Sequence, residues 1–168
     1  MVTDLRQLPR EDQALVGVGV LAFIASFLPY YGASLHGMPG RPLLFGGNVS
    51  TSVTAWHGWN IVALLLMLAV TAIAAVRALA PETELPSLPV SWNFILVAVS
   101  AVSSLIYVVR TFTLDSGNVL GIDFGLRWGA YVLLILLLAH TVLAAMRLRS
   151  SGEATRWTDA GASPPPAS

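Results

Sequence analysis

Residues 128–146 read WGAYVLLILLLAHTVLAAM, and Arg127 and Arg147 stand directly on either side of them. The stretch contains one His and no Asp, Glu, Lys or Arg. A helix needs about 20 predominantly apolar residues to cross the hydrocarbon core of a bilayer. This segment is therefore predicted to be a membrane span with a basic residue at each end.

Three more segments have a similar length and apolar character: residues 14–31, 58–76 and 91–109. The whole chain agrees, because 55% of it is hydrophobic and 11% is charged, whereas soluble domains carry about a quarter charged residues. We predict an all-α membrane protein, a four-transmembrane-helix bundle that forms one domain over residues 1–149. The first segment could instead be a signal peptide, but no small-x-small cleavage site follows it promptly, so we expect it to be retained.

The arginines indicate which way the spans run. Six of them lie on the side that is cytoplasmic if the N-terminus is inside, and three lie on the other side. Because cytoplasmic loops carry an excess of basic residues, both termini are predicted to be cytoplasmic. The use of Arg without any Lys, beside abundant Ala, Val and Leu, is typical of a GC-rich bacterial genome. We expect a multi-pass protein of the bacterial cytoplasmic membrane, with a disordered tail at residues 150–168.

Both loops on the outer side have the patterns of β-hairpins. In the first, residues 43–45 and 49–53 would pair across a turn at 46–48. In the second, residues 111–114 and 119–124 would pair across the intervening Asp-Ser-Gly-Asn. A single hairpin is marginally stable, so we predict that the two join in one small extracytoplasmic sheet. Their apolar side chains form a candidate partner-binding surface: Leu43, Phe45, Phe112, Ile122 and Phe124.

His140 is a titratable side chain inside a span, which makes it a candidate functional site. Residue counting along the spans places Ser100 and Thr71 near the same depth, so we predict that His140 faces the bundle interior close to one of them. The candidate intramembrane polar cluster is His140, Ser100, Ser104, Thr71 and Tyr107. Two interpretations stay open, because hydroxyl residues at helical spacing can form a close helix–helix seam or line a polar permeation path.

Other features argue against several classes of protein. The absence of Cys excludes disulfides, thiolate metal sites and thiol catalysis. Nine basic and nine acidic residues balance each other, so nothing indicates a nucleic-acid partner. The chain has no Ser–His–acid grouping by position, no paired carboxylates within a span and no phosphate-cradling Gly motif. We therefore predict no enzyme, no cofactor and no metal site.

Four short landmarks resemble a known group of proteins. They are SFLPYYG at residues 26–32, TAWHG at 54–58, VVRT at 108–111 and GAY at 129–131. Their order resembles small, uncharacterised four-span bacterial integral membrane proteins with an FLPWY-like exit from span one and an AW-x-G-like start of span two. Tyr30 stands where that group often has Trp. The resemblance implies a four-helix bundle in the cytoplasmic membrane and carries no assigned activity.

A looser likeness in topology is to claudin-like proteins, which have four spans, a longer first outer loop and an outer sheet. The Cys pair of their first loop is absent here. Likeness of fold alone does not assign a function.

We expect a structural or accessory protein, embedded in the lipid bilayer, that binds another membrane or envelope component or associates with itself. The apolar set on the outer loops would make that contact. The alternative is a small transporter or channel subunit that uses the polar face of span three and His140.

Overall fold

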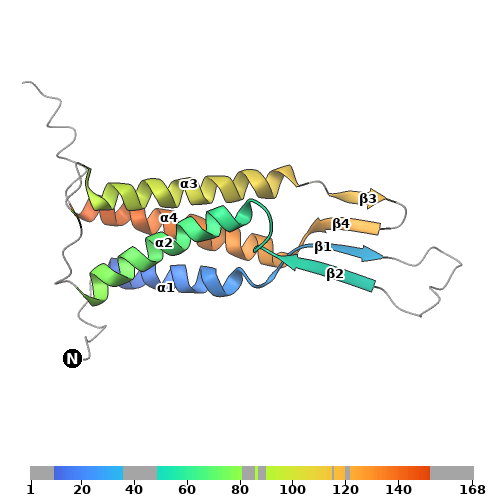
Figure 1. Ribbon diagram of the computed structural model, residues 1–168, viewed down its shortest axis with the longest axis horizontal. Helices are drawn as coiled ribbons and strands as arrows, with labels where there is room; N and C mark the ends of the chain where they lie inside the picture. The colour runs from blue at the N-terminus through green and yellow to red at the C-terminus, as the bar shows by residue number, and fades with distance from the viewer. Residues whose placement is uncertain are drawn as a thin grey trace, which may run out of the picture.

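The computed structural model describes residues 10–35, 49–80, 86, 90–114, 116–119 and 122–151. Its helices are α1 (Arg10–Ala25), α2 (Asn60–Leu79), α3 (Trp92–Thr113) and α4 (Trp128–Ser150). Its strands are β1 (Pro29–Leu35), β2 (Val49–Thr54), β3 (Gly117–Val119) and β4 (Ile122–Leu126). The helices lie side by side as a bundle, and the sheet extends from the end where α1 and α3 finish (Figure 1).

Three helices, α2, α3 and α4, are long and apolar enough to cross a membrane. They begin close to the predicted starts and continue beyond the predicted ends. The extra turns contain arginines, Arg77 in α2, Arg110 in α3 and Arg147 in α4. A cation is favourable in the last turn of a helix because the helix dipole is negative there. The helices therefore extend through residues that the hydropathy pattern placed outside the spans.

The first helix differs from the span predicted for residues 14–31. α1 has 16 residues, begins earlier, at Arg10, and ends at Ala25, and a fourth span over the predicted range is not seen. After Ala25 the chain continues in tight turns, in which the Leu28 N–H donates to the Ala25 carbonyl at 3.0 Å. Pro29 stops this run, because proline lacks a backbone N–H and disfavours helical backbone in the residue before it. The aromatic residues that follow, Tyr30 and Tyr31, belong to β1 instead.

The two outer loops do join in one antiparallel sheet, as predicted, with strand order β2-β1-β4-β3. The joining strand is β1, whose first three residues, 29–31, had been assigned to the end of a membrane span. β2 pairs with β1. The predicted partner of β2, residues 43–45, and the predicted turn at 46–48 lie outside the described residues.

The second hairpin was predicted with the wrong first strand. Residues 111–113 are helical, because α3 continues to Thr113, whose hydroxyl donates to the Arg110 carbonyl at 3.3 Å. Gly117 and Asn118, predicted as turn residues, lie in β3 and pair with β4. At the C-terminal end, α4 includes Ser150, and residues 152–168 of the predicted tail lie outside the described residues.

The sheet has two chemically different faces, because residues paired directly across antiparallel strands point to the same side. The register places Gly32 opposite Ser52 and Gly125, and Ser34 opposite Ser50 and Asp123. We call this side the polar face. The apolar face contains Tyr31, Ala33, Val53, Ile122, Phe124 and Leu126, with Thr51 among them.

An ion pair closes the bundle at the end away from the sheet. The Nε of Arg147, in the last turn of α4, lies 2.9 Å from Oδ1 of Asp12, in the first turn of α1. Both side chains are nearly buried. Each charge also has the sign that its helix terminus favours, so the pair aligns α1 with α4.

α1 packs tightly against α2 at Gly19, where a Cβ atom added to the glycine would overlap the side chain of Thr71. Gly17, one half-turn earlier, has no atom within 4 Å of such a Cβ. These two glycines of one helix therefore form a matched pair, one at a tight contact and one facing open space.

We predict that Gly19→Ala lowers the free energy of unfolding by about 1–3 kcal/mol, the usual cost of overpacking. Gly17→Ala should be neutral or slightly stabilising, because alanine restricts the unfolded chain without meeting a neighbour. Thermal unfolding of both variants in the same detergent measures the difference. Equal melting temperatures for the two variants would contradict the close packing of α1 on Thr71.

Candidate functional site

The imidazole of His140 lies fully buried in the middle of the bundle. Its Nδ1 is 2.9 Å from Oγ of Ser100 on α3, and its Nε2 is 3.3 Å from Oγ1 of Thr71 on α2. The prediction that His140 faces the interior near one of these hydroxyls is confirmed, and it contacts both. One side chain of α4 thus connects three helices.

The hydrogen bonds around Thr71 determine which ring nitrogen carries the proton. The Thr71 hydroxyl has a single proton, which it donates to the Met67 carbonyl at 2.9 Å. It can therefore only accept from His140, so Nε2 is the protonated nitrogen of a neutral imidazole. Nδ1 then accepts from the hydroxyl of Ser100, and both ring nitrogens are satisfied without a charge.

Ser104 belongs to the same region but is connected to it through Thr141, a residue outside the predicted cluster. Thr141 Oγ1 lies 2.7 Å from Oγ of Ser104 and 3.1 Å from Oγ of Ser100. Ser104 Oγ also lies 3.0 Å from the Leu137 carbonyl. Thr141 could have been predicted from the sequence, because it is a hydroxyl residue that directly follows His140 and lies at the depth of two serines on α3.

Tyr107 is not part of this cluster. Its hydroxyl donates to the carbonyl of Ala130 at 3.0 Å, near the sheet end of the bundle. Its ring packs edge-on against Tyr30 with the centroids 5.6 Å apart, and the Tyr30 hydroxyl lies 3.1 Å from Oγ1 of Thr111. The five predicted residues therefore occupy two separate levels of the bundle.

The serines of α3 form hydrogen bonds to two different helices, and Ser103 bonds to α2. Its hydroxyl donates to the Ala63 carbonyl on α2 at 2.7 Å, while Ser100 and Ser104 bond to α4. Hydroxyls that bond across to neighbouring helices are typical of a helix–helix seam. This geometry fits the seam interpretation of the polar residues of α3.

The candidate partner-binding residues of the outer loops are distributed over different elements. Phe112 lies in the last turn of α3 and is 76% exposed. Ile122 and Phe124 lie together on the apolar face of the sheet. Leu43 and Phe45 lie outside the described residues. Val53, which was not predicted, shares the apolar face with Phe124.

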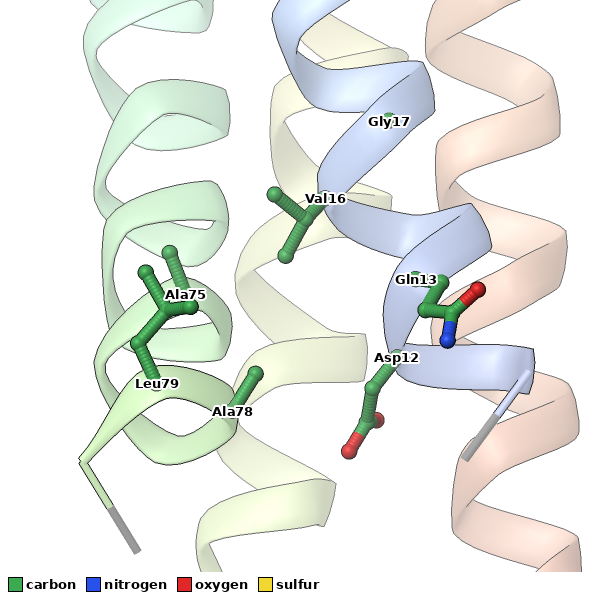
Figure 2. A pocket seen from close by; sticks show the side chains of 7 residues that line it. All are labelled: Asp12, Gln13, Val16, Gly17, Ala75, Ala78 and Leu79. Atoms are coloured by element: carbon green, nitrogen blue, oxygen red, sulfur yellow. The ribbon is translucent and has the colours of Figure 1, made fainter. Parts of the chain in front are cut away.

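A lateral groove of about 270 Å³ runs between α1 and α2, near the Asp12–Arg147 ion pair. Figure 2 shows Val16 extending from α1 toward α2 and the Asp12 side chain at the base of the groove. Small residues widen it, with Gly17 on one side and Ala75 and Ala78 on the other. Over the described residues, no group of three or more His, Asp or Glu side chains is placed to hold a metal ion.

No protein-family model matches the chain, and no match was found among curated proteins or solved structures. The resemblance to small four-span bacterial membrane proteins therefore stays a prediction.

We predict that His140→Ala lowers the free energy of unfolding by about 2–4 kcal/mol, because a fully buried side chain is replaced by a cavity and two interhelical hydrogen bonds are lost. His57→Ala is the matched control, since His57 is exposed at the sheet end of the bundle. Thermal unfolding in detergent compares them. If both variants unfold at the wild-type temperature, His140 does not hold the helices together.

Proposed function

We propose that this protein is a four-span accessory protein of the bacterial cytoplasmic membrane, and that it binds another protein through the apolar face of its sheet. Support for the membrane location comes from α2, α3 and α4, which are long and apolar enough to span. In this proposal α1 is the fourth embedded segment, although its 16 residues extend only about 24 Å at 1.5 Å per residue.

The surface of α1 supports its placement beside the other helices in lipid. Leu15 points into the bundle, but four large apolar side chains in the second half of α1 point outward: Val20, Leu21, Phe23 and Ile24. Phe27 continues this exposed apolar strip after the helix ends. A soluble helix normally turns such residues toward a core, whereas hydrocarbon is a suitable environment for them.

Exposed aromatic rings support the position of the membrane boundary at the sheet end. Trp59 is the N-cap residue of α2, and Trp128 is the first residue of α4. Tryptophan is enriched at membrane–water interfaces. Together with the arginine bias of the opposite side, the position of these rings supports the proposal that the sheet lies outside the membrane and both termini lie in the cytoplasm.

The observation that carries the partner-binding proposal is the uneven burial of the apolar face. Tyr31 and Leu126 pack against the hydrophobic core of the bundle. Val53, opposite Tyr31 on the edge strand β2, is 39% exposed, and Phe124, two residues from Leu126 along β4, is 36% exposed. An antiparallel sheet commonly keeps one face in contact with apolar groups, so the exposed part of this face is suited to contact with another protein.

The alternative of a transporter or channel subunit draws less support from the geometry. The hydroxyls of Ser100, Ser103 and Ser104 all bond to neighbouring helices. A polar path would instead need such groups to face a common space through which a solute could pass. We therefore favour the accessory function.

We predict that Phe124→Asp weakens partner retention at least tenfold, because a carboxylate would be buried in an apolar contact. Ser34→Asp is the matched control, since Ser34 lies on the polar face of the same sheet at the next register position. The assay is extraction into polymer nanodiscs, followed by mass spectrometry of the intact particle. Equal partner retention by the two variants, or a wild-type particle that contains one copy of the chain and no other protein, would contradict the proposal.

A further inference from the structure

A second hollow lies where the sheet meets the start of α4. It has a volume of about 210 Å³ and is lined by Pro29, Ser50, Thr51, Ser52, Arg127 and Trp128. Ser50 and Ser52 belong to the polar face, and both are exposed. We call this hollow the Arg127 pocket.

The backbone N–H and the backbone carbonyl of Arg127 are both hydrogen-bonded. Its N–H donates to the Tyr30 carbonyl on β1 at 2.8 Å, and its carbonyl accepts from the Ala130 N–H of α4 at 3.0 Å. Arg127 therefore links β1 to α4, and these two bonds fix the position from which its side chain extends.

The side chain of Arg127 lies across the sheet at Gly32. A Cβ atom added to Gly32 would come within 2.6 Å of Nε and 3.2 Å of Nη2 of Arg127. Gly32 is buried, and its φ is not in the left-handed region, so close approach rather than backbone strain explains the glycine. The absence of a side chain at position 32 provides the space that the guanidinium group occupies.

Two other arginines of the bundle have protein acceptors. Arg77 donates to Oδ1 of Asn93 at 2.8 Å, and Arg147 pairs with Asp12. For Arg127, no hydrogen bond or ion pair of the guanidinium group is formed within the part of the chain that the structure describes. Asp123 is on the polar face too, but farther along β4, and it does not line the pocket.

We propose that the Arg127 pocket binds a phosphate oxyanion. The planar guanidinium group of Arg127 matches two phosphate oxygens at once, and the hydroxyls of Ser50 and Ser52 add donors from the same side. The lining contains one cation and three hydroxyl residues and no carboxylate. This combination selects an anion with several acceptor oxygens.

The position of the pocket indicates where such an anion is available. Trp128 lines it and is 59% exposed, and tryptophan at the end of a span lies at the level of the lipid headgroups. A phospholipid headgroup presents its phosphate at this level, and free phosphate offers the same chemistry. The lipid source rests on the membrane location proposed above, whereas binding of free phosphate does not.

The test uses the full chain in detergent with two probes. The first is an equal mixture of phosphatidylglycerol and a galactosyl diacylglycerol, a lipid without phosphate, followed by native mass spectrometry of the lipids retained. The second is inorganic phosphate, followed by thermal unfolding. The variants are Arg127→Gln and the double variant Ser50→Ala/Ser52→Ala. Arg110→Gln is the control, because it removes an arginine from the sheet end of α3 without touching the pocket.

We expect wild type and Arg110→Gln to retain one phosphatidylglycerol in preference to the galactolipid, and Arg127→Gln to lose that preference at least tenfold. The serine double variant should lose it in part and also reports the result if Arg127→Gln fails to fold. Stabilisation of wild type by inorganic phosphate, absent in Arg127→Gln, would assign the same site to the free anion. Equal loss of preference in Arg127→Gln and Arg110→Gln would show only general attraction of charges, and together with no response to phosphate it would overturn the proposal. Recovery of the chain in the soluble fraction would contradict the membrane location alone, since the phosphate measurement tests the pocket independently.

Discussion

The arrangement of the helices depends on the two hydrogen bonds of the His140 imidazole. A polar group buried away from water must find its hydrogen-bond partners inside the protein. His140 finds them on two helices, Ser100 of α3 and Thr71 of α2. Both bonds form only when the helices have the right rotation and the right depth. Gly19 then lets α1 approach Thr71 closely, so all of the helices meet at this level.

Contacts at the two ends of the bundle extend this alignment. At one end, Asp12 and Arg147 hold α1 against α4. At the other end, Trp56 donates to the hydroxyl of Ser26 at 2.8 Å, and the N–H of Arg127 donates to the carbonyl of Tyr30. The sheet is thus attached to the bundle through backbone and side-chain bonds. Its polar and apolar faces are consequently held in a fixed direction relative to the helices.

Much of the helical structure follows from hydropathy. The segments that became α2, α3 and α4 are continuous and apolar, and depth counting from their ends was sufficient to bring His140 to Ser100 and Thr71. The end of α1 was not predictable in this way, because Tyr30 and Tyr31 suit a membrane interface and a strand equally well. The joining of the two loops was predicted, but not that β1 is the strand that pairs with β4, because this pairing connects residues far apart in the chain.

The remaining differences have similar causes. Thr111 and Thr113 have the β-branched side chains typical of strands, yet they continue α3 because no proline or glycine ends the helix before them. Thr141 and Asp12 were missed because each acquires its role from a partner on another helix. The position of His140 within a span predicted the depth of the polar cluster. Which serines of α3 bond to α2 and which bond to α4 could be learned only from the packed structure.

The most direct test of this account is the access of water to the level of His140. The chain contains no Cys, so Ser100→Cys would introduce a single thiol with nearly the same shape as the serine. We expect a water-soluble maleimide to leave this thiol unlabelled in intact membranes and to label it after denaturation, while Ser52→Cys on the exposed polar face is labelled in both conditions. Labelling of Ser100→Cys in the intact protein as fast as Ser52→Cys would contradict a sealed helix–helix seam and would indicate a water-filled path through the bundle.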